Sequence, residues 1–130
     1  MARFVLDTHT CVYYLSAPKR LGSKAAQALQ KIETGHDEAW IPAAVVAELA
    51  LLHELRRIKV SMADLKNIFE ETSTLNFSPL DLEQLEIFSL LSSVRDPFDR
   101  FVISAARALE AKLITKDELI QESGLVQVVW

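Results

Sequence analysis

The segment that most constrains the fold runs from residue 95 to 117, because one helix start, one helix and one buried strand follow each other closely. Asp96-Pro97 predicts a helix N-terminus, since proline fits the first helical turn. Apolar residues then recur at helical spacing, at Phe98, Val102, Ala105, Ala106 and Leu109. The short apolar run 113–115 predicts a buried strand. Helix N-termini and strand C-termini share one edge of an open parallel sheet, so Asp99 and Asp117 are expected to meet there.

Short apolar runs alternate with helical patterns along the rest of the chain. Strands are expected at 3–6, 39–41, 74–77 and 126–130, and helices at 10–15, after Ser23, at 43–58, at 61–71 and after Asp81. The wide apolar stripe of the 43–58 helix, through Leu55, predicts a buried helix. Leu82, Leu85 and Phe88 are expected on the inner face of the helix after Asp81. The alternation predicts an α/β domain with a mostly parallel sheet.

Composition limits the class of protein. A chain of 130 residues is expected to form a single domain, residues 1–130. It lacks an apolar run of about 18 residues and a signal-peptide core, so we expect neither a membrane span nor secretion. Cys11 is the one cysteine, which fits a core residue in a reducing, cytoplasmic compartment. The net charge of −4 neither indicates nor excludes nucleic-acid binding, because acids clustered at a metal site lower the total.

Four acids stand beside apolar sequence rather than in a solvated charge run: Asp7, Glu48, Asp99 and Asp117. If they converge, like-charge repulsion raises their pKa values unless a cation is present, and Mg²⁺ or Mn²⁺ prefers such oxygen ligands. Each acid also has a structural interpretation. Asp7 and Asp117 suit helix caps, and Asp99 suits the positive end of a helix dipole. Glu48 needs a partner when buried, such as Arg56 or Arg100.

Four ordered motifs carry a resemblance to a known family. They are Phe4-Val5-Leu6-Asp7-Thr8, residues 44–49 around Glu48, residues 96–103 beginning Asp-Pro-Phe-Asp, and Leu113-Ile114-Thr115-Lys116-Asp117. Together they resemble a PIN domain, specifically a VapC-like toxin of the toxin–antitoxin type. No single motif is specific, whereas the ordered set spans nearly the whole chain.

The resemblance implies a PIN-like three-layer α/β/α fold with a short, mostly parallel central sheet. It also implies a metal-dependent endoribonuclease that hydrolyses RNA with metal-activated water and leaves 5′-phosphate and 3′-hydroxyl ends. Asp7 and Asp99 are then the principal ligands of Mg²⁺ or Mn²⁺, while Glu48 and Asp117 bind directly or through water. A cognate antitoxin and a homodimer are the implied partners.

Other residues near these motifs are secondary candidates. Asp96 either faces the same cleft or only caps the helix, and the hydroxyls of Thr8 and Thr115 are placed to donate to a carboxylate or a phosphate. The substrate-binding candidates, which would hold RNA phosphates or else form ordinary surface ion pairs, are Arg100, Arg107 and Lys116, with Arg95 beside them.

Three other functions would also explain an acid at the end of the first strand or a PIN-like fold. A haloacid-dehalogenase-like phosphatase would need a second aspartate two positions after Asp7, but position 9 is histidine. A receiver domain would need an adjacent acidic pair near the first strand, which is missing. A catalytically silent PIN-like module would only bind a partner, and the four acids argue against it. The histidines lack zinc-ligand spacing, and His9 is expected at the rim of the cleft.

Overall fold

The structure, a computed structural model that describes residues 1–130, is built on one five-stranded sheet in the order β3-β2-β1-β4-β5. The strands are β1 (Arg3–Leu6), β2 (Glu38–Pro42), β3 (Leu75–Ser78), β4 (Lys112–Ile114) and β5 (Val128–Val129). All neighbouring strands are parallel, and Phe4 of the central strand β1 pairs with Ala39 on one side and Lys112 on the other. The prediction of a mostly parallel α/β fold is therefore confirmed.

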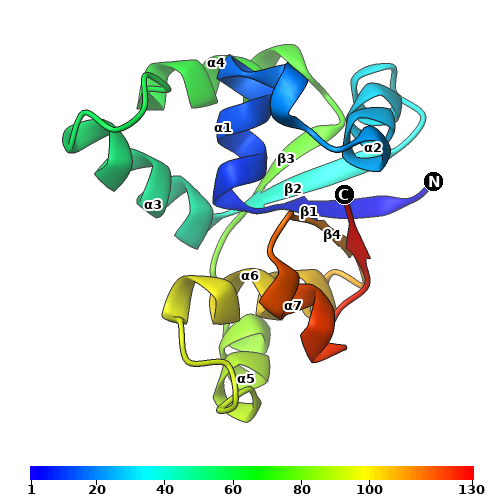
Figure 1. Cartoon of the computed structure of the whole chain (residues 1–130), viewed down its shortest axis with the longest axis vertical. Coiled ribbons are helices and arrows are strands. Elements are labelled where there is room, and N and C mark those ends of the chain that lie inside the picture. Colours follow the sequence, from blue (N-terminus) through cyan, green and yellow to red (C-terminus); the bar gives the residue numbers. More distant parts are fainter.

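Helices cover both faces of this sheet (Figure 1). They are α1 (Thr8–Ser16), α2 (Ser23–Glu33), α3 (Ala43–Glu54), α4 (Met62–Glu71), α5 (Leu82–Leu90), α6 (Pro97–Ala108) and α7 (Glu118–Ser123), with a short 3-10 turn, η1 (Pro18–Arg20). Figure 1 shows α1, α2 and α4 on one side of the sheet and α5, α6 and α7 on the other. None of the helices combines the length and the apolar character that crossing a bilayer requires.

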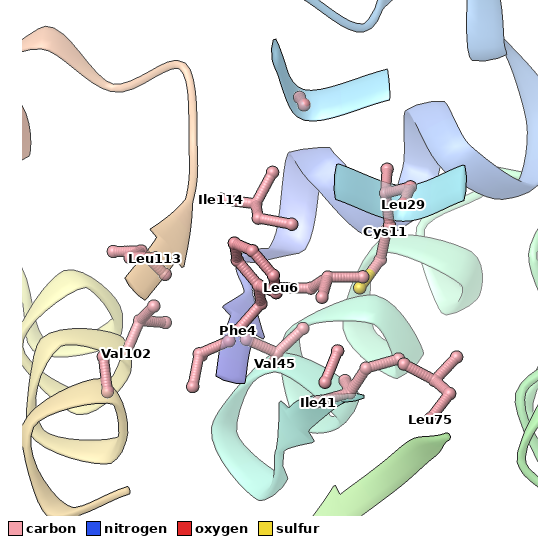
Figure 2. Packing of buried hydrophobic residues seen from close by; sticks show 14 of the residues in the cluster. Phe4, Leu6, Cys11, Leu29, Ile41, Val45, Leu75, Val102, Leu113 and Ile114 are labelled. Carbon is pink, nitrogen blue, oxygen red and sulfur yellow. The ribbon is translucent and has the colours of Figure 1, made fainter. Parts of the chain in front are cut away.

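The core extends from both faces of the sheet to the helices. The inner strands β1 and β4 are short apolar runs rather than alternating sequences, because their side chains are buried on both faces. Figure 2 shows residues of four strands packed with Leu29, Val45 and Val102 from the helices. Cys11 belongs to this cluster, as expected, and burial raises the pKa of its thiol well above the ordinary value. The thiol is therefore a core group and not a reactive nucleophile.

Helix starts follow the expected capping chemistry in most places. Ser61 and Asp64 form a reciprocal capping box at the start of α4, and Asp81 caps α5. The cap expected at Ser23 is wrong by one residue. Gly22 occupies the cap position without a side-chain hydrogen bond, and Ser23 is the first helical residue.

Two helices expected inside the protein lie largely at its surface. α3 ends at Glu54, because Arg56 adopts a left-handed backbone with φ of 59°, and Leu55 is 63% exposed. On α5, Leu82 and Leu85 are 71% and 40% exposed, contrary to expectation, while the buried residue is Gln84. Phe88 faces inward to stack on Phe101 of α6, with 4.4 Å between ring centroids. Only one face of α3 and of α5 packs against the rest of the protein, so part of the apolar stripe of each helix remains exposed to solvent.

Gly22, at the start of α2, packs closely against the C-terminal residue Trp130, and this contact can be tested by mutation. A Cβ atom at Gly22 would lie 2.6 Å from the backbone carbon of Trp130 and 2.7 Å from its Cδ1 atom. We therefore expect Gly22→Ala to lower the free energy of unfolding by about 1–3 kcal/mol, the usual range for overpacking. Thermal unfolding followed by circular dichroism measures the change. Ser23→Ala, at an exposed neighbour, is the control, and equal melting temperatures for both variants would contradict this packing.

Candidate functional site

Carboxylates from four separate parts of the chain line one cleft of about 530 Å³. Asp7 follows β1, Asp117 lies just beyond β4, Glu48 lies on α3 and Asp99 lies in the first turn of α6. The strands are parallel, so the ends of β1 and β4 deliver their acids to the same edge of the sheet. The structure thus brings together the four acids that the sequence singled out.

Asp7 is held at the junction of β1 and α1 by hydrogen bonds to both carboxylate oxygens. Its Oδ1 accepts the backbone N–H of Thr10 at 2.9 Å, which makes Asp7 the N-cap of α1. Its Oδ2 accepts the hydroxyl of Thr115, which is buried at the end of β4. The hydroxyl of Thr115 in turn accepts the backbone N–H of Asp117 at 3.1 Å. Thr115 therefore fixes the position of Asp7 relative to the loop that carries Asp117.

Glu48 is half-buried and has a neutral partner. Its Oε1 accepts the hydroxyl of Thr8, a buried residue at the start of α1. The expected ion pair with Arg56 or Arg100 is wrong, because the one salt bridge in the structure joins Arg3 and Glu38. Both threonine hydroxyls thus donate to carboxylates, which is one of the two roles expected for them.

Asp99 has the most perturbed carboxylate of the cleft. Its pKa is raised to about 6, first by burial and then by the negative charges of Asp96, Asp117, Asp7 and Glu48. Asp96 is the N-cap of α6, accepting the N–H of Asp99 at 3.1 Å, and it lines the same cleft. Asp96 therefore both caps α6 and faces the cleft, and its capping bond fixes the turn that carries Asp99.

Asp117 also combines a capping bond with a place in the cleft. Its Oδ1 accepts the backbone N–H groups of Leu119 and Ile120, at 2.9 and 3.1 Å, and so caps α7. Glu118 lines the cleft as well and was missed by the sequence reasoning. The sequence signal that could have identified Glu118 is its position directly after Asp117, just beyond a buried strand.

The basic candidates divide between the cleft and other places. Lys116 lines the cleft, where its ammonium donates to the hydroxyl of Tyr13 and lies 4.8 Å from the centre of that ring. Arg100 and Arg107 do not line it. Arg100 Nε donates to the carbonyl of Val94 at 2.8 Å, and Arg107 Nη1 donates to the carbonyl of Leu125 at 3.1 Å. His9 is exposed and lines the cleft.

The donors suit a hard divalent cation, although no three His, Cys, Asp or Glu side chains are close enough to hold a metal ion in this conformation. Carboxylate oxygens are the ligands that Mg²⁺ and Mn²⁺ prefer. The carboxylate of Asp99 accepts no hydrogen bond within the protein, and neither do Glu48 Oε2 and Asp117 Oδ2. Asp99 can therefore turn toward a cation without breaking a hydrogen bond of its side chain, while Glu48 and Asp117 each have one free oxygen for it. The cation would favour the charged form of Asp99, which burial and the neighbouring acids disfavour.

Comparisons with known proteins agree with this architecture. The PIN domain family model matches residues 4–123. Ribonuclease VapC22 of Mycobacterium tuberculosis is 27% identical over 124 residues, covering 93% of this chain and 92% of that protein. Among solved structures, VapBC2 of Rickettsia felis bound to a promoter DNA fragment has a TM-score of 0.70 at 16% identity, covering 97% of this chain and 96% of that chain. DNA-bound VapBC of Salmonella typhimurium has a TM-score of 0.68 at 15% identity, covering 98% and 97%. The expected three-layer PIN-like fold is confirmed.

Proposed function

Because this chain belongs to the PIN domain family, we propose that it is a Mg²⁺-dependent endoribonuclease and the toxin of a toxin–antitoxin pair. One observation carries the proposal: Asp7, Glu48, Asp99 and Asp117 line a single cleft although they are far apart in the sequence. The similarity to ribonuclease VapC22 supports RNA as the substrate. The phosphatase alternative has no comparable support, since the family match covers most of the chain.

We assign Asp7 and Asp99 as principal ligands of Mg²⁺, with Glu48 and Asp117 binding directly or through water, and Mn²⁺ as a substitute. When bound, the cation would lower the pKa of a water molecule and neutralise charge on the leaving oxygen. The protein's own contribution is orientation. Hydroxyl donors hold Asp7 and Glu48, while the Asp96 cap holds the turn of Asp99.

Lys116 is the residue we propose for contact with an RNA phosphate. It is the one Lys or Arg that lines the cleft, and its ammonium is positioned by Tyr13, whose hydroxyl accepts a hydrogen bond from it. A lysine in this place supplies a cation to the phosphate backbone without reading sequence. Arg100 and Arg107 are bonded to backbone carbonyls elsewhere, so we assign them no direct contact in this cleft.

The proposal is tested by cleavage of a broad panel of RNAs with purified protein. We expect cleavage with Mg²⁺ or Mn²⁺, no cleavage in EDTA, and 5′-phosphate ends on the products. A silent binding module would cleave nothing and would keep its partner after the four acids were changed to amides. Absence of metal-dependent cleavage across the panel would refute the proposal for those RNAs. Release of phosphate from small phosphomonoesters would point instead to a phosphatase.

The hydrogen bond from Thr8 to Glu48 predicts a graded effect on this activity. Thr8→Val removes the donor while keeping a similar volume, and we expect cleavage to fall by about 10- to 100-fold, as for other residues that orient metal ligands. Thr8→Ser keeps the hydroxyl and should retain most of the activity. Initial rates at saturating Mg²⁺ and circular dichroism measure activity and folding. Equal rates for Thr8→Val and wild type would show that this bond does not orient Glu48 for catalysis.

A cognate antitoxin and a second copy of this chain are the partners we propose. Solved relatives in the fold comparison are complexes named VapBC, which supports an antitoxin. The uncovered leucines of α5, with Leu82 71% and Leu90 82% exposed, support a further protein contact. Light scattering coupled to size exclusion should give twice the 14.6 kDa of one chain, and Leu82→Glu should reduce that mass if α5 is in the interface. A wild-type mass of one chain would exclude the homodimer.

A further inference from the structure

A largely apolar pocket of about 610 Å³ adjoins the acid cleft. The two share Asp96, Asp99 and Ile120 as lining residues. The pocket is otherwise apolar along much of its surface, where it is lined by Val94, Ile103, Leu119 and Leu125. A ligand that occupied both spaces would place a polar, metal-associated part in the cleft and an apolar part in this pocket.

Two arginines of α6 hold backbone segments that line the pocket. Arg100 Nε donates to the carbonyl of Val94 at 2.8 Å, and Arg107 Nη1 donates to the carbonyl of Leu125 at 3.1 Å. The second segment is tightened further by the N–H of Leu125, which donates to Ser123 Oγ at 3.3 Å. Both loops are thereby fastened to one helix, so the pocket is formed before any ligand arrives. Such preorganisation lowers the entropy lost on binding.

We propose that this pocket receives one unpaired nucleobase of the RNA, next to the phosphate that lies in the acid cleft. The inference builds on the proposed ribonuclease function and adds a base-binding subsite to it. A nucleobase is flat and neutral, so its faces can pack against the aliphatic side chains of this pocket without repulsion from the nearby acids. An anionic group would instead be repelled by Asp96 and Asp99, which form part of the wall.

Two further features favour a base as the occupant. Leu119 is 77% exposed although it lines the pocket, and a stacked base would cover it. Arg95 lines the pocket and takes part in no salt bridge, which leaves its guanidinium available to donate hydrogen bonds to a base edge. Arginine recognises acceptor-rich edges such as that of guanine through paired hydrogen bonds.

The test compares nucleotides with the same sugar phosphate lacking a base. In ¹⁵N-labelled protein with Mg²⁺, we expect AMP, GMP, CMP or UMP to shift the amide resonances of Val94, Leu119 and Leu125, while ribose 5-phosphate leaves them in place. Identical shifts for ribose 5-phosphate, or none for any nucleotide, would overturn the proposal. Shifts at these amides on raising the protein concentration without nucleotide would assign the pocket to a second copy and would also overturn it.

A pair of leucine variants sharpens the test. Leu119→Ala should weaken nucleotide binding by about 3- to 10-fold, while Leu55→Ala, at an exposed leucine after α3 and outside the pocket, should bind as wild type does. Equal affinities for both variants would remove Leu119 from the subsite and contradict the proposal. Metal-dependent cleavage of RNA is measured separately. Cleavage without base-dependent shifts would refute only the subsite, and base-dependent shifts without cleavage would refute only the ribonuclease.

Discussion

Asp99→Asn is expected to reduce RNA cleavage by on the order of 10³-fold or more, while making the metal-free protein more stable at neutral pH. The loss of activity follows from removing a principal ligand of Mg²⁺. The gain in stability follows from the pKa of Asp99, which burial and four neighbouring acids raise to about 6. At pH 7 the folded protein holds this carboxylate charged in an unfavourable place. Asparagine removes the charge, and we expect a gain of about 1–2 kcal/mol, less than the full shift implies because Asp99 is partly exposed.

The sign of the pH dependence gives an independent check. The pKa of Asp99 in the folded state lies above its ordinary value of 3.8, so the folded state binds the proton more tightly than the unfolded chain does. Asp99 contributes its full share to the free energy of unfolding below about pH 4, and this contribution is lost as the pH rises through about 6. Wild-type protein in EDTA should therefore lose more stability across this window than Asp99→Asn. Chemical denaturation at several pH values measures it, and parallel profiles for the two proteins would contradict the unfavourable charge.

Two substitutions at Asp7 are expected to lose cleavage equally, by on the order of 10³-fold, yet to differ in stability. The asparagine side chain of Asp7→Asn can still cap α1 through its carbonyl oxygen, and its amide nitrogen, which replaces Oδ2, can donate to the hydroxyl of Thr115. The free energy of unfolding should therefore change by no more than about 1 kcal/mol. Asp7→Ala removes the cap and leaves the buried hydroxyl of Thr115 without its acceptor. We expect that variant to lose about 2 kcal/mol.

Denaturant unfolding in EDTA separates the two roles of Asp7, because it excludes any contribution of bound metal. The measurement compares both variants with wild type under identical conditions. If Asp7→Asn were as unstable as Asp7→Ala, the charge of Asp7 would be needed for folding. If Asp7→Asn cleaved RNA at the wild-type rate, Asp7 would not be a principal ligand.

Local signals predicted the elements that position the cleft. The Asp96-Pro97 start of α6, the Ser61 capping box and the apolar runs of β1 and β4 depend on neighbouring residues, so sequence alone reveals them. The meeting of Asp99 and Asp117 followed from one topological rule, that helix N-termini and the ends of parallel strands share one edge, whereas the place of Glu48 beside them was implied by the family resemblance. One of the two roles expected for Thr115, donation to a carboxylate, is the one that the structure shows, at Asp7.

Features that depend on distant contacts could not be predicted in the same way. An apolar stripe shows which face of a helix avoids water, but not whether this chain covers it, and therefore α3 and α5 were assigned too much burial. The spacing of Arg100 and Arg107 shows that they share a face of α6. It does not show that residues 94 and 125 fold back to meet them. The apolar pocket between those loops had no sequence signal for the same reason.

The capping bonds described above affect how evolutionary records of such a protein are interpreted. Asp7, Asp96 and Asp117 each begin a helix, so selection for a folded chain alone would keep Asp, Asn or Ser at those positions after activity had been lost. The side chain of Asp99 does not cap a helix, and its charge opposes folding when no cation is present. An inactive descendant should therefore lose Asp99 early, and an alignment of homologues assayed for cleavage would reveal it. An aspartate at position 99 therefore indicates a catalytically active homologue, whereas acids retained at the three capping positions do not.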